Sequence, residues 1–373
     1  MQRPAPHSLD AETLFPTDYY NGREAFLAAA KAANAEIQTI QHPFARGPGD
    51  RPIWIDIATL GDPKAKYGLG FVSGTHGPEG YVGTAAQVGF LSSDLLDRSG
   101  DLRVVLLHAH CAYGYAWDSR FNEDNIDLNR NYLDFTRKPW PINEGYEQLA
   151  EAIELPDVSP ASLEASNRKM LAYAMENGFP ALQAAISAGQ YSHPNGLFFG
   201  GHAPSWSRHV MEAHFVAALR GCERIIIIDW HTGLGPSGYG EVIYSQQPGS
   251  ERWDVGQAIF EGECRSTKDG SSASADLFGT LDEALETMLQ PSDTVCVALE
   301  FGTVETQAVI AATRATSWLH TRGDRNGPDA ASILATSKAA FYIDTPEWRE
   351  AVWSRAAWAM NCAVRSLVTS PDH

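Results

Sequence analysis

The sequence predicts an α/β protein with a mixed, mostly parallel central sheet that is flanked by helices. Continuous apolar runs such as Ile225–Ile228 are typical of strands that are covered on both faces. Segments with helical patterns separate these runs, which favours short crossovers between neighbouring strands. We expect strands at residues 53–58, 67–73, 103–108, 224–230, 241–245 and 294–301.

Helices are expected near both ends of the chain and in an insertion. An alanine-rich segment at residues 21–35 predicts the first helix. The last is predicted from residue 344 or 345 to about residue 367, with Pro346 in its first turn. Residues 138–200 hold several helical patterns between prolines, and we interpret them as a helical insertion packed on the same domain. Residues 1–373 are therefore predicted to form a single domain.

The composition argues against several classes of protein. Of the 373 residues, 44% are hydrophobic and 20% are charged, which is the balance of a globular protein with a sizeable core. The formal net charge of -18 would repel a phosphate backbone, so nucleic acid is not an expected partner. No apolar run approaches the ~18 residues that a membrane span needs, so a membrane is not expected either.

The N-terminal segment and the cysteines bear on the cellular compartment. Residues 1–10 lack the apolar stretch of a signal peptide, which predicts a cytoplasmic protein. The five cysteines are scattered without a CxxC spacing, which argues against both a disulfide framework and a cysteine-ligated zinc. The sequence leaves the oligomeric state open, a homo-oligomer included.

The segment Gly74–Gly80, with the sequence GTHGPEG, directly follows an apolar strand pattern. Its His76 and Glu79 are three residues apart and can both point at one metal ion. The glycines and the proline predict a tight turn at the end of a strand rather than a long helix. In an open α/β sheet, this carboxyl edge is where sites are normally built. An HxxE turn is by itself a weak signal.

A second histidine follows the apolar run Ile225–Ile228. His231 lies at the end of this predicted strand, before a glycine-rich segment that we interpret as a turn. Two histidines and a glutamate, with one position left open for water, are the usual composition of a catalytic zinc site. Alone, His231 would be read as a hydrogen-bonded strand-end histidine. Together with the HxxE turn it predicts one zinc ion per chain.

The loop Arg120–Asn131 places two arginines in an otherwise acidic protein. Hydrolysis through a tetrahedral intermediate needs a fixed cation beside the developing oxyanion. A guanidinium group also suits a substrate carboxylate. Asp127 is positioned to accept the second ring N–H of a ligand histidine and so to fix its tautomer. The alternative reading is a charged surface loop.

A glutamate ends the predicted strand at residues 294–301. Glu300 is followed by Gly302, and at the carboxyl edge of the sheet it would be within reach of a zinc-bound water. The metal lowers the pKa of such a water to roughly 7. A carboxylate within hydrogen-bond reach then takes its proton. Alone, Glu300 could equally be a capping or ion-paired residue.

These four motifs occur in the order found in the zinc carboxypeptidase superfamily. The chain resembles in particular a bacterial carboxypeptidase-like group related to the aspartoacylase and succinylglutamate desuccinylase branch. The resemblance covers roughly residues 50–305. It implies a zinc carboxypeptidase-like fold of the phosphorylase/hydrolase type. Residues 111–114 read CAYG where family members usually have Asn-Pro-x-Gly, so the local loop shape differs.

The resemblance also implies roles for individual residues. His76, Glu79 and His231 correspond to the zinc ligands, and Glu300 to the base that later protonates the leaving amine. The remaining correspondences lie in the arginine loop: Arg120 polarises the carbonyl, Asn129 and Arg130 bind a substrate carboxylate, and Asp127 supports His76.

Other residues are weaker candidates. Tyr239 and Tyr244 are candidates for an active-site tyrosine, and His193, at the end of the insertion, is a candidate substrate contact. His108 and His110 alternate along a strand and could form a second metal pair, although no carboxylate partner is evident.

The leading hypothesis is a zinc-dependent hydrolase of amide bonds in carboxylate-bearing substrates, similar to a metallocarboxypeptidase. The alternative is a deacylase of N-acyl amino acids, similar to aspartoacylase or the desuccinylases. A shallow pocket would favour peptides, whereas a pocket closed by the insertion would favour small acylated amino acids. A more remote alternative is a non-catalytic binding protein on the same fold.

Overall fold

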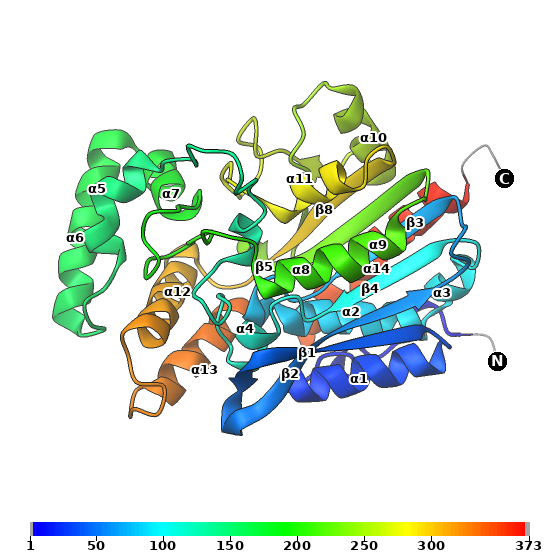
Figure 1. Ribbon diagram of the computed structural model, residues 1–373, viewed down its shortest axis with the longest axis horizontal. Coiled ribbons are helices and arrows are strands. Elements are labelled where there is room, and N and C mark those ends of the chain that lie inside the picture. Colours follow the sequence, from blue (N-terminus) through cyan, green and yellow to red (C-terminus); the bar gives the residue numbers. More distant parts are fainter. Residues whose placement is uncertain (1–2, 370–373) are drawn as a thin grey trace.

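The apolar runs of the sequence form the middle of an eight-stranded sheet in the computed structural model, which describes residues 3–369 (Figure 1). The strand order is β1-β2-β4-β3-β5-β8-β6-β7. The strands are β1 (Glu36–Gly47), β2 (Arg51–Leu60), β3 (Tyr67–Val72), β4 (Arg103–His108), β5 (Arg224–Ser237), β6 (Gly240–Ile243), β7 (Cys264–Arg265) and β8 (Asp293–Gly302).

The sheet is mixed, with its parallel strands at the centre. Strands β4, β3, β5 and β8 are mutually parallel, as are β6 and β7. The pairs β1–β2, β2–β4 and β6–β8 are antiparallel. The predicted fold class is confirmed. The long edge strand β1 was not predicted, because most of its residues are exposed and Pro43 lies within a register shift between Gln41 and Arg46.

Helices flank the sheet and also form the end of the molecule beyond its carboxyl edge. They are α1 (Tyr19–Ala32), α2 (Gly80–Ser92), α3 (Asp94–Arg98), α4 (Ala112–Ala116), α5 (Glu144–Ile153), α6 (Pro160–Asn177), α7 (Phe179–Ser187), α8 (Trp206–Val210), α9 (Ala217–Leu219), α10 (Glu251–Ile259), α11 (Leu281–Met288), α12 (Thr306–Thr321), α13 (Ala330–Phe341) and α14 (Pro346–Val368). A π-helical segment, Met211–Val216, joins α8 to α9. Within residues 3–369, no helix combines the length and the apolar character needed to cross a bilayer.

Strand β3 shows how the two faces of the sheet are covered. Phe71 points to one face and packs against Phe90 of α2. Gly68 and Gly70 point to the other face, where an added Cβ would meet side chains of the segment 215–227 at 3.3 Å or less. Side chains alternate along a strand, so α2 and the 211–219 segment lie on opposite faces. The absence of side chains at both glycines allows this close approach.

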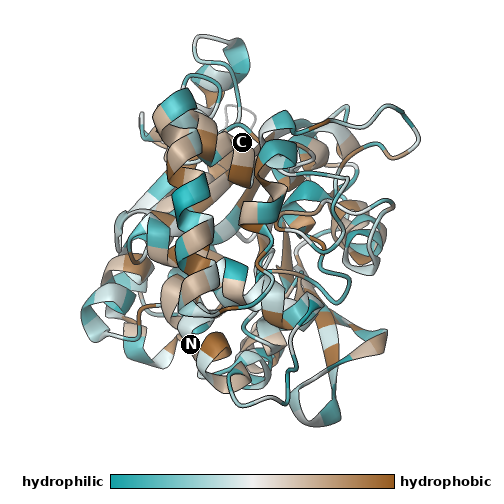
Figure 2. Cartoon of the chain, turned by 90° about the vertical axis from the view of Figure 1, so that its left-hand side faces the viewer, coloured by the Kyte–Doolittle hydropathy of each residue, from teal (hydrophilic) through white to brown (hydrophobic). Residues whose placement is uncertain are grey.

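The predicted insertion contains α5, α6 and α7, which share a small apolar core. Figure 2 turns this end of the molecule toward the viewer, with apolar and polar residues mixed along its helices, as in amphipathic helices. Arg314 of α12 is buried and joins the insertion to the sheet domain. Its guanidinium donates to the carbonyl oxygens of Ala152 at 2.6 Å and Ile153 at 3.2 Å, at the end of α5.

Candidate active site

The HxxE turn lies directly after β3, as predicted. His76 is extended, residues Gly77–Glu79 form a single 3-10 turn, and α2 begins at Gly80. The prediction of a turn is therefore right for the ligands, although a long helix follows at once. Gly77 is required here, because a Cβ would lie 2.0 Å from the carbonyl carbon of Gly114 and 2.2 Å from the carbonyl oxygen of Ser119.

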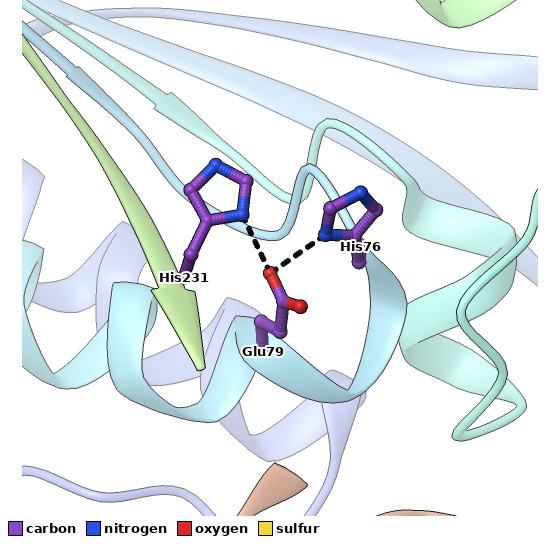
Figure 3. Close-up of side chains that lie close together, drawn as sticks. All are labelled: His76, Glu79 and His231. Carbon is purple, nitrogen blue, oxygen red and sulfur yellow. Dashed lines mark hydrogen bonds and ion pairs between the residues drawn. The ribbon is translucent and has the colours of Figure 1, made fainter. Parts of the chain in front are cut away.

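The three predicted metal ligands converge at the carboxyl edge of the sheet (Figure 3). His231 belongs to β5, which pairs with β3, so neighbouring strands deliver the two histidines. Both Nδ1 atoms point at the Oε2 atom of Glu79 and lie 2.9 Å from it. All three side chains are buried. Two imidazole nitrogens and one carboxylate oxygen directed at one point are a donor set that suits a single zinc ion.

Carboxylates support both histidines from behind. The Nε2 atom of His76 lies 3.1 Å from Asp127, as predicted, and that of His231 lies 2.7 Å from Asp229. The hydroxyl of Thr75 donates to Asp229 at 2.8 Å. Such contacts place the proton on Nε2 and leave Nδ1 free to ligate a metal. Asp229 was not predicted, although its position two residues before His231 in a strand puts both side chains on one face.

The charges of the site shift its pKa values. Burial alone would raise the pKa of Glu79, but His76 and His231 outweigh it and bring that pKa to about 2. Burial lowers the pKa of His231, yet Asp229 and Glu79 together hold it well above the ordinary value. The carboxylate of Glu79 is thus ionised at neutral pH and available as a ligand.

Arg120 lies against the metal ligands. Its Nε donates to Asp127 at 2.8 Å, and an Nη atom lies 2.7 Å from Nε2 of His76. Nε2 of His76 cannot donate to Asp127 and accept from Arg120 at once. Donation to Asp127 is the arrangement that frees Nδ1 for a metal. The other Nη atom of Arg120 is 3.6 Å from Glu79.

Asn129 and Arg130 also line the same pocket. The side-chain oxygen of Asn129 accepts from the backbone N–H of Leu281 at 2.8 Å, which holds this residue against the start of α11. Arg130 is buried, and its guanidinium donates to the carbonyl oxygens of Ser187 at 2.6 Å and Asn129 at 2.7 Å. These contacts fix its position and leave further N–H groups to bind an anion.

Glu300 of β8 is directly across from His231, its partner in the β5–β8 register. It lines the pocket, and its side chain accepts a hydrogen bond from the backbone N–H of Leu234 at 3.0 Å. Burial and the negative charge of Glu79 raise its pKa to about 8. A divalent cation on the three ligands would lower this value again, because it favours the ionised carboxylate.

The pocket encloses about 1190 Å³, including space open to solvent, and mixes apolar with acidic and hydroxyl side chains. The insertion contributes Gln183, Ile186 and Ser187 from α7, and α12 contributes Val309 and Thr313. These wall residues were not predicted, because only tertiary packing brings them beside the metal ligands.

His193 and the two candidate tyrosines do not line this pocket. His193 lies between Glu147 and Glu154, at 3.1 Å and 2.9 Å, within the insertion. The hydroxyl of Tyr239 instead donates to Glu263 at 3.2 Å on the surface, and Tyr244 is buried beside Trp253. Each therefore has a structural environment away from the metal ligands.

His108 and His110 do not form a second metal pair. In the described part of the chain, His76, Glu79 and His231 are the group whose ligand atoms come together. His108 is stacked on Phe26 in the core, with ring centroids 4.7 Å apart. His110 lies 3.1 Å from the hydroxyl of Tyr132.

A family model described as "Protein of unknown function (DUF2817)" matches residues 15–355. The chain belongs to this family. A search of curated protein sequences found no match.

Solved structures with a similar fold include metallocarboxypeptidases and a desuccinylase. Carboxypeptidase A from Helicoverpa armigera is 12% identical with a TM-score of 0.46, covering 90% of this chain and 76% of its own. A metallo-carboxypeptidase from Burkholderia cenocepacia is 14% identical with a TM-score of 0.42, covering 92% and 68%. A succinylglutamate desuccinylase from Silicibacter sp. TM1040 is 13% identical with a TM-score of 0.35, covering 77% and 67%. These likenesses concern the fold alone, and the metal site is defined by the contacts of this chain.

Proposed function

We propose that this chain is a zinc-dependent hydrolase that cleaves an amide bond in a carboxylate-bearing substrate, with one zinc ion per chain. The observation that carries the proposal is the convergence of two histidine Nδ1 atoms on Glu79, with a carboxylate behind each ring. Glu300 and two arginines line the same pocket. A purely structural metal site would use four protein ligands and would not need these groups around it.

Zinc at this site would supply a Lewis acid that polarises the scissile carbonyl and acidifies water. The chain's own proton carrier is Glu300, which takes a proton from the attacking water at its carboxylate. It then gives that proton to the nitrogen of the leaving amine. The hydrogen bond from the N–H of Leu234 fixes one of its oxygens and leaves the other for this transfer.

The arginine loop provides the fixed positive charges. Arg120, held by Asp127, stabilises the negative charge that develops on the carbonyl oxygen. Arg130, held by backbone carbonyls, and Asn129 bind the substrate carboxylate and so place the scissile bond beside Glu300. Because both guanidinium groups are already oriented in the protein, little ordering is needed when the substrate binds.

The substrate is either a peptide that loses its C-terminal residue or an N-acyl amino acid. A specific observation favours keeping the second candidate: α7 of the insertion forms part of the pocket wall through Gln183, Ile186 and Ser187. Both substrates present an amide next to a free carboxylate, so the same residues serve both reactions.

The proposal is tested by elemental analysis and by turnover of two substrate series, benzoylglycyl amino acids and N-acetyl amino acids. We expect one zinc per chain, loss of activity on chelation and recovery on adding zinc. A protein that neither copurifies with a stoichiometric metal nor binds added zinc would contradict the proposal. Turnover that survives complete removal of the metal would contradict it as well.

A further inference from the structure

The pocket continues past the metal ligands to the start of α11. Ala298 and Glu300 are two residues apart in β8, and both line the pocket. Thr280 and Asp282 line it as well, one at the N-cap and one in the first turn of α11. This region also adjoins Arg130, because Asn129 is hydrogen-bonded to Leu281 between them. A substrate carboxylate bound at Arg130 would therefore carry its side chain toward α11.

Thr280 has a buried hydroxyl that nothing in the described chain satisfies. The residue is 7% exposed, and its Oγ1 has no hydrogen-bond partner. A threonine at an N-cap normally accepts a hydrogen bond from its own helix, but here the side chain makes no such bond. An unsatisfied hydroxyl in a pocket wall costs stability. It is the kind of group that a bound ligand satisfies.

Asp282 is a pocket carboxylate without an ion pair among residues 3–369. Its acidic neighbours in the pocket, Asp276 and Glu283, share the ammonium group of Lys268 at 2.8 Å and 3.0 Å. Asp282 has no corresponding ion pair in the described residues, and its negative charge acts on Arg130, although less than the charge of Asp127 does. Burial lowers the pKa of Arg130, whereas the Asp282 carboxylate raises it.

We propose that Asp282 and Thr280 recognise a positively charged side chain on the substrate, so that the released amino acid is a basic one. Its carboxylate binds Arg130 and Asn129, and its ammonium or guanidinium group donates to the Asp282 carboxylate and the Thr280 hydroxyl. This inference rests on the proposed hydrolase function, and it names the substrate class of that same site. Opposite charges at the two ends of the ligand match the opposite charges of the pocket.

The ordinary role of an acidic residue in a first helical turn is to stabilise the helix dipole. Glu283 lies in the same turn, so it offers a matched control for Asp282. Asp282→Asn and Glu283→Gln each remove one negative charge from this turn. The two variants differ in whether the lost charge had Lys268 as its partner. An effect on the helix alone would be similar in both variants.

The experiment compares arginine with citrulline, its neutral analogue of nearly the same shape. Hydrolysis of benzoylglycyl-arginine and benzoylglycyl-citrulline is measured as kcat/KM, and binding of free L-arginine and L-citrulline is measured by calorimetry on the zinc-loaded protein. We expect wild type to prefer the arginine compounds by roughly 10- to 100-fold, because a hydrogen bond to a charged group typically strengthens binding by about this factor. Asp282→Asn should abolish the preference, Thr280→Val should reduce it, and Glu283→Gln should retain it.

The binding measurement separates the two proposals. Equal affinity for L-arginine and L-citrulline in the wild type would overturn the recognition of a cation, whether or not any amide is cleaved. A preference that persists in Asp282→Asn would overturn the assigned residue. If L-arginine binds through Asp282 but no benzoylglycyl or acetyl amino acid is hydrolysed, the inference stands and the proposed reaction fails.

Discussion

The carboxylate of Asp229 should strengthen metal binding, although it touches no metal. It lies 2.7 Å from Nε2 of His231 and is itself held by the hydroxyl of Thr75. Asp229→Asn keeps the shape of the side chain and removes its charge. Loss of such a carboxylate behind a ligand histidine typically weakens metal binding 10- to 100-fold, which is about 1.4–2.8 kcal/mol.

Proton competition partly hides this loss. Asp229 is one of the two groups that raise the pKa of His231 against the effect of burial, so the native histidine also holds a proton more tightly. A proton must leave Nδ1 before a metal binds there. Asp229→Asn weakens the binding of both the proton and the zinc ion at His231. The loss of zinc affinity should therefore be largest at high pH, where the proton no longer competes. Zinc affinity is best measured between pH 7 and pH 9, by competition with a chromophoric chelator.

Asp56→Asn provides the matched control. Asp56 of β2 is also a fully buried carboxylate, but it does not line the pocket; it pairs with Arg23 at 2.6 Å and accepts a hydrogen bond from Thr39 of β1. This variant should lose folding stability and keep its zinc affinity. If Asp229→Asn binds zinc within twofold of the wild type at pH 9, the assigned support of His231 is wrong.

Three further results are expected. Glu300→Gln should lower kcat by on the order of 10²–10⁴ while zinc content stays at the wild-type level, and full turnover in this variant would mean that another group moves the proton. Arg314→Met should lower the free energy of unfolding by about 3 kcal/mol, because the buried carbonyls of Ala152 and Ile153 lose their donor. Denaturant titration measures this free energy, and a decrease of less than about 1 kcal/mol would contradict the prediction. Burial lowers the pKa of His108 to about 4, against an ordinary 6.5, so the unfolded chain takes up a proton first as the pH falls. The free energy of unfolding should therefore fall by about 3 kcal/mol between pH 6.5 and pH 4 because of His108. In His108→Gln the free energy of unfolding should fall correspondingly less over this range. Parallel curves of unfolding free energy against pH for the two proteins would refute the assignment.

The sequence was sufficient to predict the two histidine ligands and the candidate base because each lies in a recognisable strand or shortly after one. His76 comes after β3, His231 belongs to β5 and Glu300 to β8, and these strands are parallel neighbours. Apolar runs identify such strands, and parallel strands necessarily end at one edge of the sheet. The site therefore depends on local pattern plus one topological rule, both of which are visible in a sequence.

The walls of the pocket could not be predicted in the same way. Phe341 at the end of α13 and Gln183 of α7 reach the pocket through helix packing that no short-range pattern specifies. His193 illustrates the converse error: its position at the end of the insertion suggested a substrate contact, but two glutamates hold the ring within the insertion. Loops are placed by the elements that they join, so their composition is a poor guide to position.

The charge of the buried centre gives an argument for a divalent cation that is independent of any likeness to other proteins. Four carboxylates there are each at most 8% exposed, those of Glu79, Asp127, Asp229 and Glu300. Two guanidinium groups lie beside them, that of Arg130, which is buried, and that of Arg120, whose side chain is 13% exposed. With neutral histidines, two negative charges remain, which is what one divalent ion balances. In the protein alone, the raised pKa values of His231 and Glu300 favour binding protons instead. Metal binding should therefore release protons, and the number released should fall as the pH rises, since fewer remain bound to these two groups.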